Sequence, residues 1–222
     1  VRDVNNSIRA RVVLLPANSA GDNIIFHAEG GDVVLPLLRQ QKDGEECLSL
    51  SDFVKPCGTD YVGAFAVTAG RGIEEIISGD QQTDDFKALL YQSLSDRLAE
   101  AAAELLHARV RRDIWGYAPD ERIDRQRALR AQYRGIRPAA GYPSLPDQSA
   151  IFAIEKIVGF ANVGIAVTPN GAMSPASSVS GLMIAHPASR YFMIGAIAPD
   201  QRRDYAARRG ITEEELSKWL PK

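Results

Sequence analysis

The sequence feature that most constrains the fold is a long run of apolar residues spaced three and four positions apart. The run begins after Thr83, which can cap a helix with Asp84 and Asp85 in its first turn, and it continues to about Arg112. Its apolar members are Phe86, Leu90, Leu94, Leu98, Ala101 and Leu105. Because these positions share one face, the spacing predicts one long helix whose apolar side packs against the core.

Shorter segments with strand and turn signals lie on both sides of this helix. Strands are expected at residues 11–15, 23–26, 32–36 and 61–67 before it, and a hairpin of residues 178–184 and 191–197 after it. Further helices are expected at residues 120–132, 147–157 and 200–209, and a last one that begins at Thr212 and carries Trp219. Short connections between the first strands favour antiparallel pairing. Strands followed by helices and then by strands predict an α+β domain.

The composition is that of an ordinary globular chain. Its 222 residues carry a formal net charge of -2 and are 45% hydrophobic, which is enough apolar material for a sizeable core. This charge gives no basis for binding nucleic acid or an anionic membrane, and no apolar run approaches the length of a membrane span. We therefore expect a cytoplasmic protein in which Cys47 and Cys57 stay reduced. Because the chain begins with Val1 rather than methionine, we expect residues 1–222 to be a single domain from a longer protein.

Residues 135–143, with the sequence GIRPAAGYP, have the composition of a recognition loop. Proline fixes the backbone and glycine allows a ligand to approach closely, while Arg137 and Tyr142 supply a guanidinium and a phenol. A surface connection rich in turn-forming residues would have the same composition. The glycines of the turn at residues 68–72 match neither a dinucleotide-binding pattern nor a phosphate loop.

A second stripe of the long helix is polar and contains Asp96, Glu100, His107 and Arg111 around Ala103. A solvated helix face with local ion pairs would show the same pattern. The spacing is not specific to a metal, and the chain shows neither a Ser-His-Asp order nor an activated cysteine, so we expect no metal site and no catalytic side chain. Glu100 is suited to accept hydrogen bonds from a cationic or amino-bearing ligand.

Several motifs together resemble one known family. The most specific pair is RPAAGYP at residues 137–143 and WGYAP at residues 115–119. The further matching stretches are residues 12–21, 51–69, 96–119, 133–146, 178–181 (SVSG), 186–191 (HPASRY) and a tail within residues 200–220. Over essentially its whole length the chain resembles the activation domain of cobalamin-dependent methionine synthase. This resemblance implies a mainly antiparallel twisted sheet with a long central helix and flanking helices.

The resemblance also implies a binding site for S-adenosyl-L-methionine. In that family the RPAxGYP loop holds the ligand, so Arg137 would pair with the ligand's carboxylate through a bidentate fork. The backbone around Ala139 and Gly141 would meet the adenosine portion, where small residues permit contact. Glu100 would accept a hydrogen bond from the ligand's ammonium or lie near its sulfonium.

Four further positions are implied to complete the site and its surroundings. Tyr191 and Phe192 would form a wall of the ligand pocket. Tyr142 would lie at the edge that faces the cobalamin-binding module, and Asp96 would contact that module. The cobalamin itself would be bound by the partner module rather than by this chain.

The function implied by the resemblance is reactivation of the synthase. The domain would position the methyl donor for reductive methylation of cob(II)alamin, with flavodoxin or a related reductase as the electron source. It would thus be one part of a methyltransferase of methionine biosynthesis, 5-methyltetrahydrofolate–homocysteine methyltransferase, and would not turn over alone. The protein's role would be proximity and orientation, because the sulfonium and the cofactor carry the reactivity.

Three departures from the family pattern bear on the strength of binding. Residues 1–15 contain no match to the family's upstream D-W-x-P-F-F segment, Gln148 stands where the family usually has histidine, and Ala131 stands where a loop carboxylate is common. We therefore expect reduced affinity in this piece of the chain. The alternative hypothesis is a docking domain for the cobalamin module or flavodoxin whose ligand site has degenerated.

Overall fold

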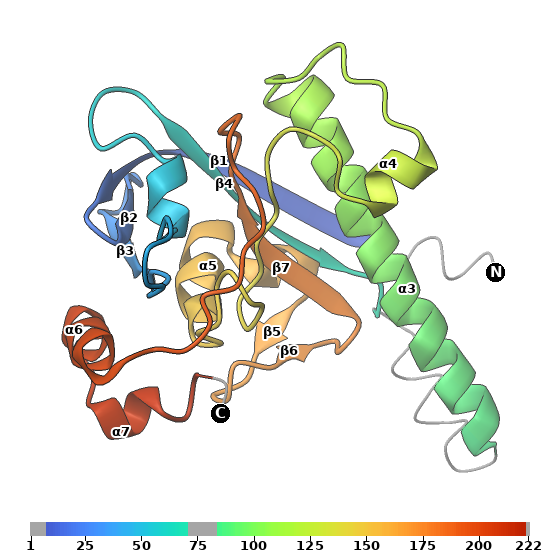
Figure 1. The fold of residues 1–222 in the computed structure, drawn as a ribbon. Coiled ribbons are helices and arrows are strands. Elements are labelled where there is room, and N and C mark those ends of the chain that lie inside the picture. Colours follow the sequence, from blue (N-terminus) through green and yellow to red (C-terminus); the bar gives the residue numbers. More distant parts are fainter. Residues whose placement is uncertain (1–7, 71–83, 221–222) are drawn as a thin grey trace.

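The computed structural model describes residues 8–70 and 84–220. Within these residues five strands form a sheet in the order β3, β2, β1, β4 and β7, with every neighbouring pair antiparallel (Figure 1). The strands are β1 (Arg9–Ala20), β2 (Asn23–Phe26), β3 (Val33–Pro36), β4 (Tyr61–Thr68) and β7 (Ser178–Met183). The predicted α+β class with a mainly antiparallel sheet is confirmed.

Strand β1 joins two parts of the sheet because it changes partner along its length. It pairs with β4 as far as Pro16, and residues 17–20 then pair with β2. The sequence predicted a strand only at residues 11–15 and a turn from Asn18, so this turn was placed too early. The chain reverses at Gly21, whose φ of +55° lies in the left-handed region that favours glycine.

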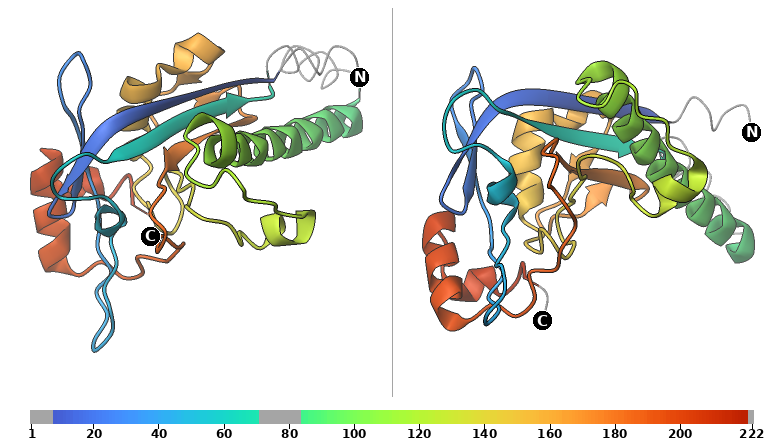
Figure 2. Two further views of the ribbon diagram at one scale, coloured as in Figure 1. Left: turned by 90° about the horizontal axis from the view of Figure 1, so that it is seen from above. Right: turned by 45° about the horizontal axis from the view of Figure 1, so that its top comes forward.

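Strand β4 is covered on both of its faces (Figure 2). The covering helices are α3 (Asp85–Arg109) and α5 (Ala150–Val158). Ala64 and Ala66 belong to the main core on the α5 side, whereas Phe65 packs with residues of α3. Ile151 and Ile154 of α5 are buried, which confirms the helix predicted at residues 147–157. Alternation along β4 therefore supplies both the central core and the surface beneath α3.

Helix α3 is the predicted long helix, and it ends in a widened turn. Asp84 caps it by accepting a hydrogen bond from the backbone N–H of Lys87 at 3.0 Å, while Thr83, the predicted cap, lies outside the described residues. After Arg109 the chain continues as the π-helical turn η2 (Val110–Ile114). Turns of this kind are common at functional sites.

The predicted core face of α3 is wrong. Its buried side chains are small or polar, namely Ala88, Ser95, Ala99, Ala103 and His107. Of the predicted apolar stripe, Phe86 is 76% exposed and Leu105 is 63% exposed. Where α3 packs against the sheet, small side chains such as Ala103 let the helix backbone approach it closely. The first part of α3 extends beyond the sheet (Figure 1).

The shorter elements follow the sequence predictions unevenly. They are α4 (Arg125–Leu129), α6 (Pro199–Arg209), α7 (Glu213–Leu216), η1 (Leu50–Phe53), η3 (Phe160–Val163), β5 (Ala166–Val167) and β6 (Met173–Ser174). Helix α6 matches its prediction and stops at Gly210, and Thr212 caps α7 as expected. Of the helix predicted at residues 120–132, only α4 forms. The segment is polar, and no residue of α4 is buried. Helix α7 ends before Trp219, which lies in the following turn. None of the helices in residues 8–70 and 84–220 is long and apolar enough to cross a membrane.

The hairpin predicted between residues 178–184 and 191–197 does not form. Residues 191–197 are not a strand, because the free edge of β7 is already paired with another segment. Ile136 and Ile184 exchange backbone hydrogen bonds of 3.0 Å, and the N–H of Leu182 donates to the carbonyl of Pro138 at 2.8 Å. The recognition loop thus takes the sheet edge that the sequence analysis had assigned to residues 191–197.

Candidate functional site

The loop at residues 135–143 is fixed to the sheet by a close approach that only glycine permits. A Cβ atom added to Gly181 of β7 would lie 2.4 Å from the carbonyl oxygen of Pro138. Any other residue at this position would push the loop away from β7. The glycine of the SVSG motif therefore sets the position of the Arg137 backbone relative to the sheet.

The rest of the loop is tied to the segment that carries the predicted aromatic wall. The Ser144 hydroxyl donates to the carbonyl of Phe192 at 2.5 Å and accepts from the N–H of the same residue at 3.1 Å. The N–H of Ile194 donates to the carbonyl of Pro143 at 3.0 Å. These bonds replace the pairing that the predicted hairpin would have made and place the two segments side by side.

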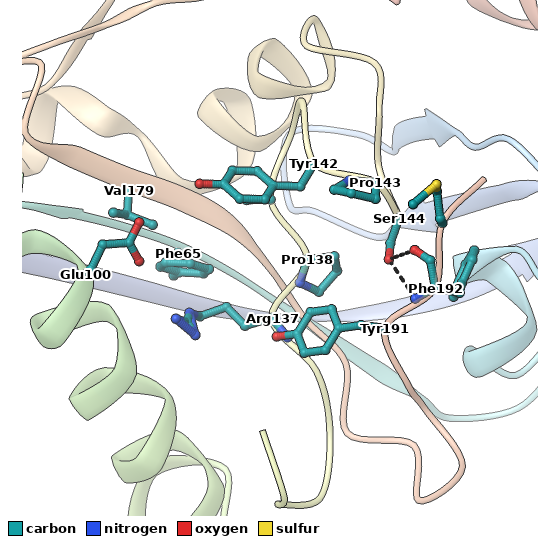
Figure 3. Close-up of a pocket in the computed structure, with 12 residues that line it drawn as sticks. Phe65, Glu100, Arg137, Pro138, Tyr142, Pro143, Ser144, Val179, Tyr191 and Phe192 are labelled. Carbon is teal, nitrogen blue, oxygen red and sulfur yellow. Dashed lines mark hydrogen bonds between the residues drawn. The ribbon is translucent and has the colours of Figure 1, made fainter. Parts of the chain in front are cut away.

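Between this loop, α3 and β7 lies a cavity of about 510 Å³. Six of the predicted site residues line it, namely Glu100, Arg137, Ala139, Tyr142, Tyr191 and Phe192. The other lining residues are Phe65, Pro138, Pro143, Ser144, Val179 and Met193. Figure 3 shows Glu100 from α3 and Arg137 from the loop projecting towards the same space beside Phe65. The arrangement offers a carboxylate and a guanidinium across an apolar floor.

Two predicted site residues lie outside this cavity. Gly141 lines a neighbouring cavity of about 560 Å³, which shares Tyr142 with the first. Asp96 lies one turn before Glu100 on α3, where its Oδ1 accepts from the Ser177 hydroxyl at 2.7 Å. Asp96 is therefore held at the surface, away from the space that Glu100 faces.

Two of the three departures from the family pattern, Gln148 and Ala131, can be placed in the structure, whereas the segment of residues 1–15 lies partly outside the described residues. Gln148 does not line the cavity; its side-chain amide donates to the carbonyl of Gly171, between β5 and β6, at 2.9 Å. Ala131 is exposed and has a φ of 49°. Neither side chain contributes to the cavity wall in this structure.

Arg137 is held at both its backbone and its side chain. Its backbone N–H donates to the Tyr191 hydroxyl at 2.8 Å. Its guanidinium Nη1 lies 3.4 Å from Oε2 of Glu104, and the side chain is only 13% exposed. Sequence analysis missed Glu104, although its position four residues after Glu100 places it one turn farther along the same side of the helix.

A buried polar cluster lies beyond Glu104 on the next turns of α3. Arg111 donates to Glu121 at 2.5 Å and stacks 4.0 Å above the Tyr133 ring, while His107 contacts Tyr117 at 3.3 Å. Burial, assisted by the charges of Arg111 and Arg137, lowers the pKa of His107 from 6.5 to about 3. Burial also raises the pKa of both tyrosines above the ordinary value. His107 is therefore neutral at physiological pH.

The site has the features of a binding pocket. Within the described part of the chain, no three His, Cys, Asp or Glu residues are grouped so that they could hold a metal ion. The apolar contributors that sequence analysis missed, Phe65 and Val179, lie on one face of adjacent strands, and the alternation of β4 and β7 was the available signal. The geometry suits a zwitterionic ligand with an attached apolar or aromatic part.

Comparison with known proteins identifies relatives of the whole chain. A family model described as "Vitamin B12 dependent methionine synthase, activation domain" matches residues 1–210. A solved structure, described as the crystal structure of the MetH reactivation domain bound to AdoHcy, aligns with a TM-score of 0.89 and 37% sequence identity. That match covers 98% of this chain and 74% of the other chain.

Proposed function

The chain belongs to the family of activation domains of vitamin B12-dependent methionine synthase, and we propose that its cavity binds S-adenosylmethionine during reactivation of that enzyme. The observation that carries this proposal is the shared cavity of Arg137, Glu100 and Tyr191. These residues come from a loop, a helix and a distant segment, and the fold brings them together around one space. The related MetH reactivation domain was crystallised with AdoHcy, the molecule that remains when S-adenosylmethionine gives up its methyl group.

The cavity fits such a ligand in size and in charge. A volume of about 510 Å³ lies within the range of small-molecule sites, roughly 300–1,000 Å³. Arg137 presents a guanidinium that can grip a carboxylate, and Glu100 presents a carboxylate that can face an ammonium or a sulfonium. The apolar floor of Phe65 and Val179 is suited to the remaining part of the molecule.

We assign the contacts of the ligand as follows. Arg137 pairs with the carboxylate, the backbone near Ala139 and Gly141 meets the adenosine portion, and Glu100 lies by the ammonium or sulfonium. The aromatic wall consists of Tyr191 and Phe192. The assignment of Gly141 requires the ligand to reach the boundary of the neighbouring cavity, because this residue lines that cavity.

The outward-facing residues are proposed to meet the cobalamin module. Tyr142 is 59% exposed and stands between the two cavities, where it can face a docked partner. Asp96 lies at the surface one turn from Glu100 and can contact the same partner. Flavodoxin or a related reductase is the proposed electron source.

In this proposal the chain's own residues bind and orient S-adenosylmethionine, and none of their side chains transfers a proton. Bound S-adenosylmethionine would supply the methyl group, and cobalamin held by the partner module would accept it together with an electron. The contribution of Arg137 and Glu100 is to fix the ligand at its two charged ends, so that its methyl group faces the open side of the cavity. Such positioning can lower a barrier by several kcal/mol. The domain is one part of a methyltransferase and is not expected to turn over alone.

Calorimetric titration with S-adenosylmethionine tests the assignment. Replacing Arg137 by alanine removes the only cation that lines the cavity among the described residues, and we expect affinity to fall about 10-fold to 100-fold, as for loss of a charge-assisted hydrogen-bonded pair. The matched control is Arg190→Ala, because that exposed arginine pairs with Glu46 on the surface at 2.7 Å. The control should bind like the parent. Equal binding of S-adenosylmethionine by the parent and by Arg137→Ala would contradict the assignment. A parent chain that binds a cobalamin module but no S-adenosylmethionine would favour the alternative, a docking domain without a ligand site.

A further inference from the structure

We propose that Glu104 is the residue that positions the Arg137 guanidinium in the cavity. This inference rests on the proposed function, in which Arg137 receives the ligand's carboxylate. Glu104 does not line the cavity and so does not touch the ligand in this arrangement. Its role would be exerted through the arginine.

The backbone and the side chain of Arg137 are fixed by different residues. The Tyr191 hydroxyl accepts from the backbone N–H, which fixes the main chain but leaves the long side chain free to rotate. Within residues 8–70 and 84–220, the only side chain bonded to the guanidinium is Glu104, at 3.4 Å from Nη1. Glu104 is therefore the contact that selects the direction of the side chain.

The contact between these two residues directs the guanidinium without saturating it. A guanidinium has five N–H donors, and Glu104 engages only Nη1 at a long distance. The remaining donors are available for a bidentate bond to a ligand carboxylate. On the other side of the pair, Oε1 of Glu104 is buried and has no hydrogen-bond partner among the described residues. Glu104 has one further partner, the Tyr133 hydroxyl, which donates to Oε2 at 3.4 Å.

The charges around the pair support the same conclusion. The other buried guanidinium, that of Arg111, is already paired with Glu121. His107, which lies between Glu104 and Arg111 along the helix, is neutral because burial and the charges of Arg111 and Arg137 lower its pKa to about 3. Glu104 is the carboxylate that compensates Arg137 on this side of the cavity.

Two other roles for Glu104 make different predictions. If it only stabilised the fold, its removal would weaken every ligand equally. If it acted only through its negative field on a cationic ligand, decarboxylated S-adenosylmethionine, which carries more positive charge, would be weakened most. If it positions Arg137, only ligands that carry the carboxylate should be affected.

The experiment is a titration of the parent chain and its variants with S-adenosylmethionine and with the decarboxylated analogue. For Glu104→Ala we expect the affinity for S-adenosylmethionine to fall about fivefold, near the upper end for a partly exposed ion pair, and the affinity for the analogue to change by less than about twofold. Glu104→Gln keeps an acceptor oxygen near Arg137 and should restore part of the loss. Glu214→Ala, which removes an exposed carboxylate of α7, should leave both affinities unchanged.

A double-mutant cycle separates this inference from the proposed function. In an Arg137→Ala background, Glu104→Ala should cause no further loss of S-adenosylmethionine affinity. If Arg137→Ala itself leaves the preference for S-adenosylmethionine over the analogue intact, the proposed function is wrong. If Arg137→Ala removes that preference but Glu104→Ala weakens both ligands equally, or the analogue more, only the positioning role is overturned.

Discussion

The two ends of α3 bury different kinds of residue, and the contrast separates the part that extends beyond the sheet from the part beside the candidate site. Towards its start the buried side chains are small, such as Ala88 and Ser95, while Leu90 and Leu94 are exposed. Towards its end the buried side chains include two large polar ones, His107 and then Arg111 of η2, beside the apolar Ala103 and Val110. The first part extends beyond the sheet (Figure 1), and its buried side chains are small. The second part packs Ala103 against β4 and β7. It also buries two polar side chains at a cost in solvation, which the contacts of His107 with Tyr117 and of Arg111 with Glu121 offset in part.

The largest effect should come from breaking the buried pair of Arg111 and Glu121 at the end of the helix beside the candidate site. Arg111→Met keeps much of the side-chain volume but leaves Glu121, which is 14% exposed, without its guanidinium. We expect the free energy of unfolding to fall by about 3 kcal/mol, because an unpaired buried charge is strongly destabilising. Denaturant unfolding measures this change.

The neighbouring residue offers a control for that variant. Arg112 is exposed and lies 3.7 Å from Asp113 on the surface, so Arg112→Met should change the free energy of unfolding by less than about 0.5 kcal/mol. Equal effects of the two variants would show that the buried ion pair is no more important for stability than an ion pair on the surface.

A smaller effect should appear as a pH dependence of stability. The pKa of His107 is about 3 in the folded protein, against 6.5 ordinarily, so below pH 6.5 the unfolded chain binds a proton that the folded chain does not. The free energy of unfolding therefore falls as the pH decreases from 6.5 towards 3, and between pH 6.5 and 5 this amounts to about 2 kcal/mol. Denaturant midpoints of the parent and His107→Gln at these two pH values measure it. A parent and a variant with the same pH dependence would show that His107 is not held neutral.

The smallest effect is expected at the start of the helix. Leu90→Ser replaces a side chain that is 56% exposed, and we expect the free energy of unfolding to change by less than about 0.5 kcal/mol. The same measurement on Ala88→Ser, at a position that is 3% exposed on the opposite face, should show a larger loss. A larger loss for Leu90→Ser would mean that the apolar stripe, not the small-residue face, packs in solution.

The same contrast explains what the sequence could predict about the fold. Short apolar runs bounded by turn residues located β2, β3, β4 and β7, and helix start and stop signals located α6 and α7, because these signals are local. The buried face of α3 was predicted wrongly because the large apolar side chains were expected to be buried, whereas the buried side chains are small or polar. Which face of a helix is buried depends on how closely the helix approaches its neighbours, which is a property of the packed structure.

The errors around residues 191–197 have a related cause. This segment has strong strand propensity, but Ile136 and Pro138 occupy the edge of β7 that it would need. Propensity does not reveal competition between two segments for one edge. The aromatic residues of the segment nevertheless line the cavity, because Ser144 and Pro143 bind its backbone.

The candidate site was more accessible to sequence reasoning than the packing around it. The loop containing Arg137 was recognisable by composition and by family resemblance, and Glu100 followed from the helical stripe. Glu104 was missed because its partner, Arg137, is 33 residues away in sequence, and nothing local indicates the pairing. The residues proposed to bind the ligand were thus easier to find than the residue proposed to position Arg137.

A crystal structure of the chain with S-adenosylmethionine tests the central claim most directly. We predict that the ligand's carboxylate lies within hydrogen-bonding distance of the Arg137 guanidinium, with its sulfonium end towards Glu100 and its adenosine portion along the backbone near Ala139. A ligand bound outside this cavity, or bound within it with its carboxylate turned away from Arg137, would contradict the account.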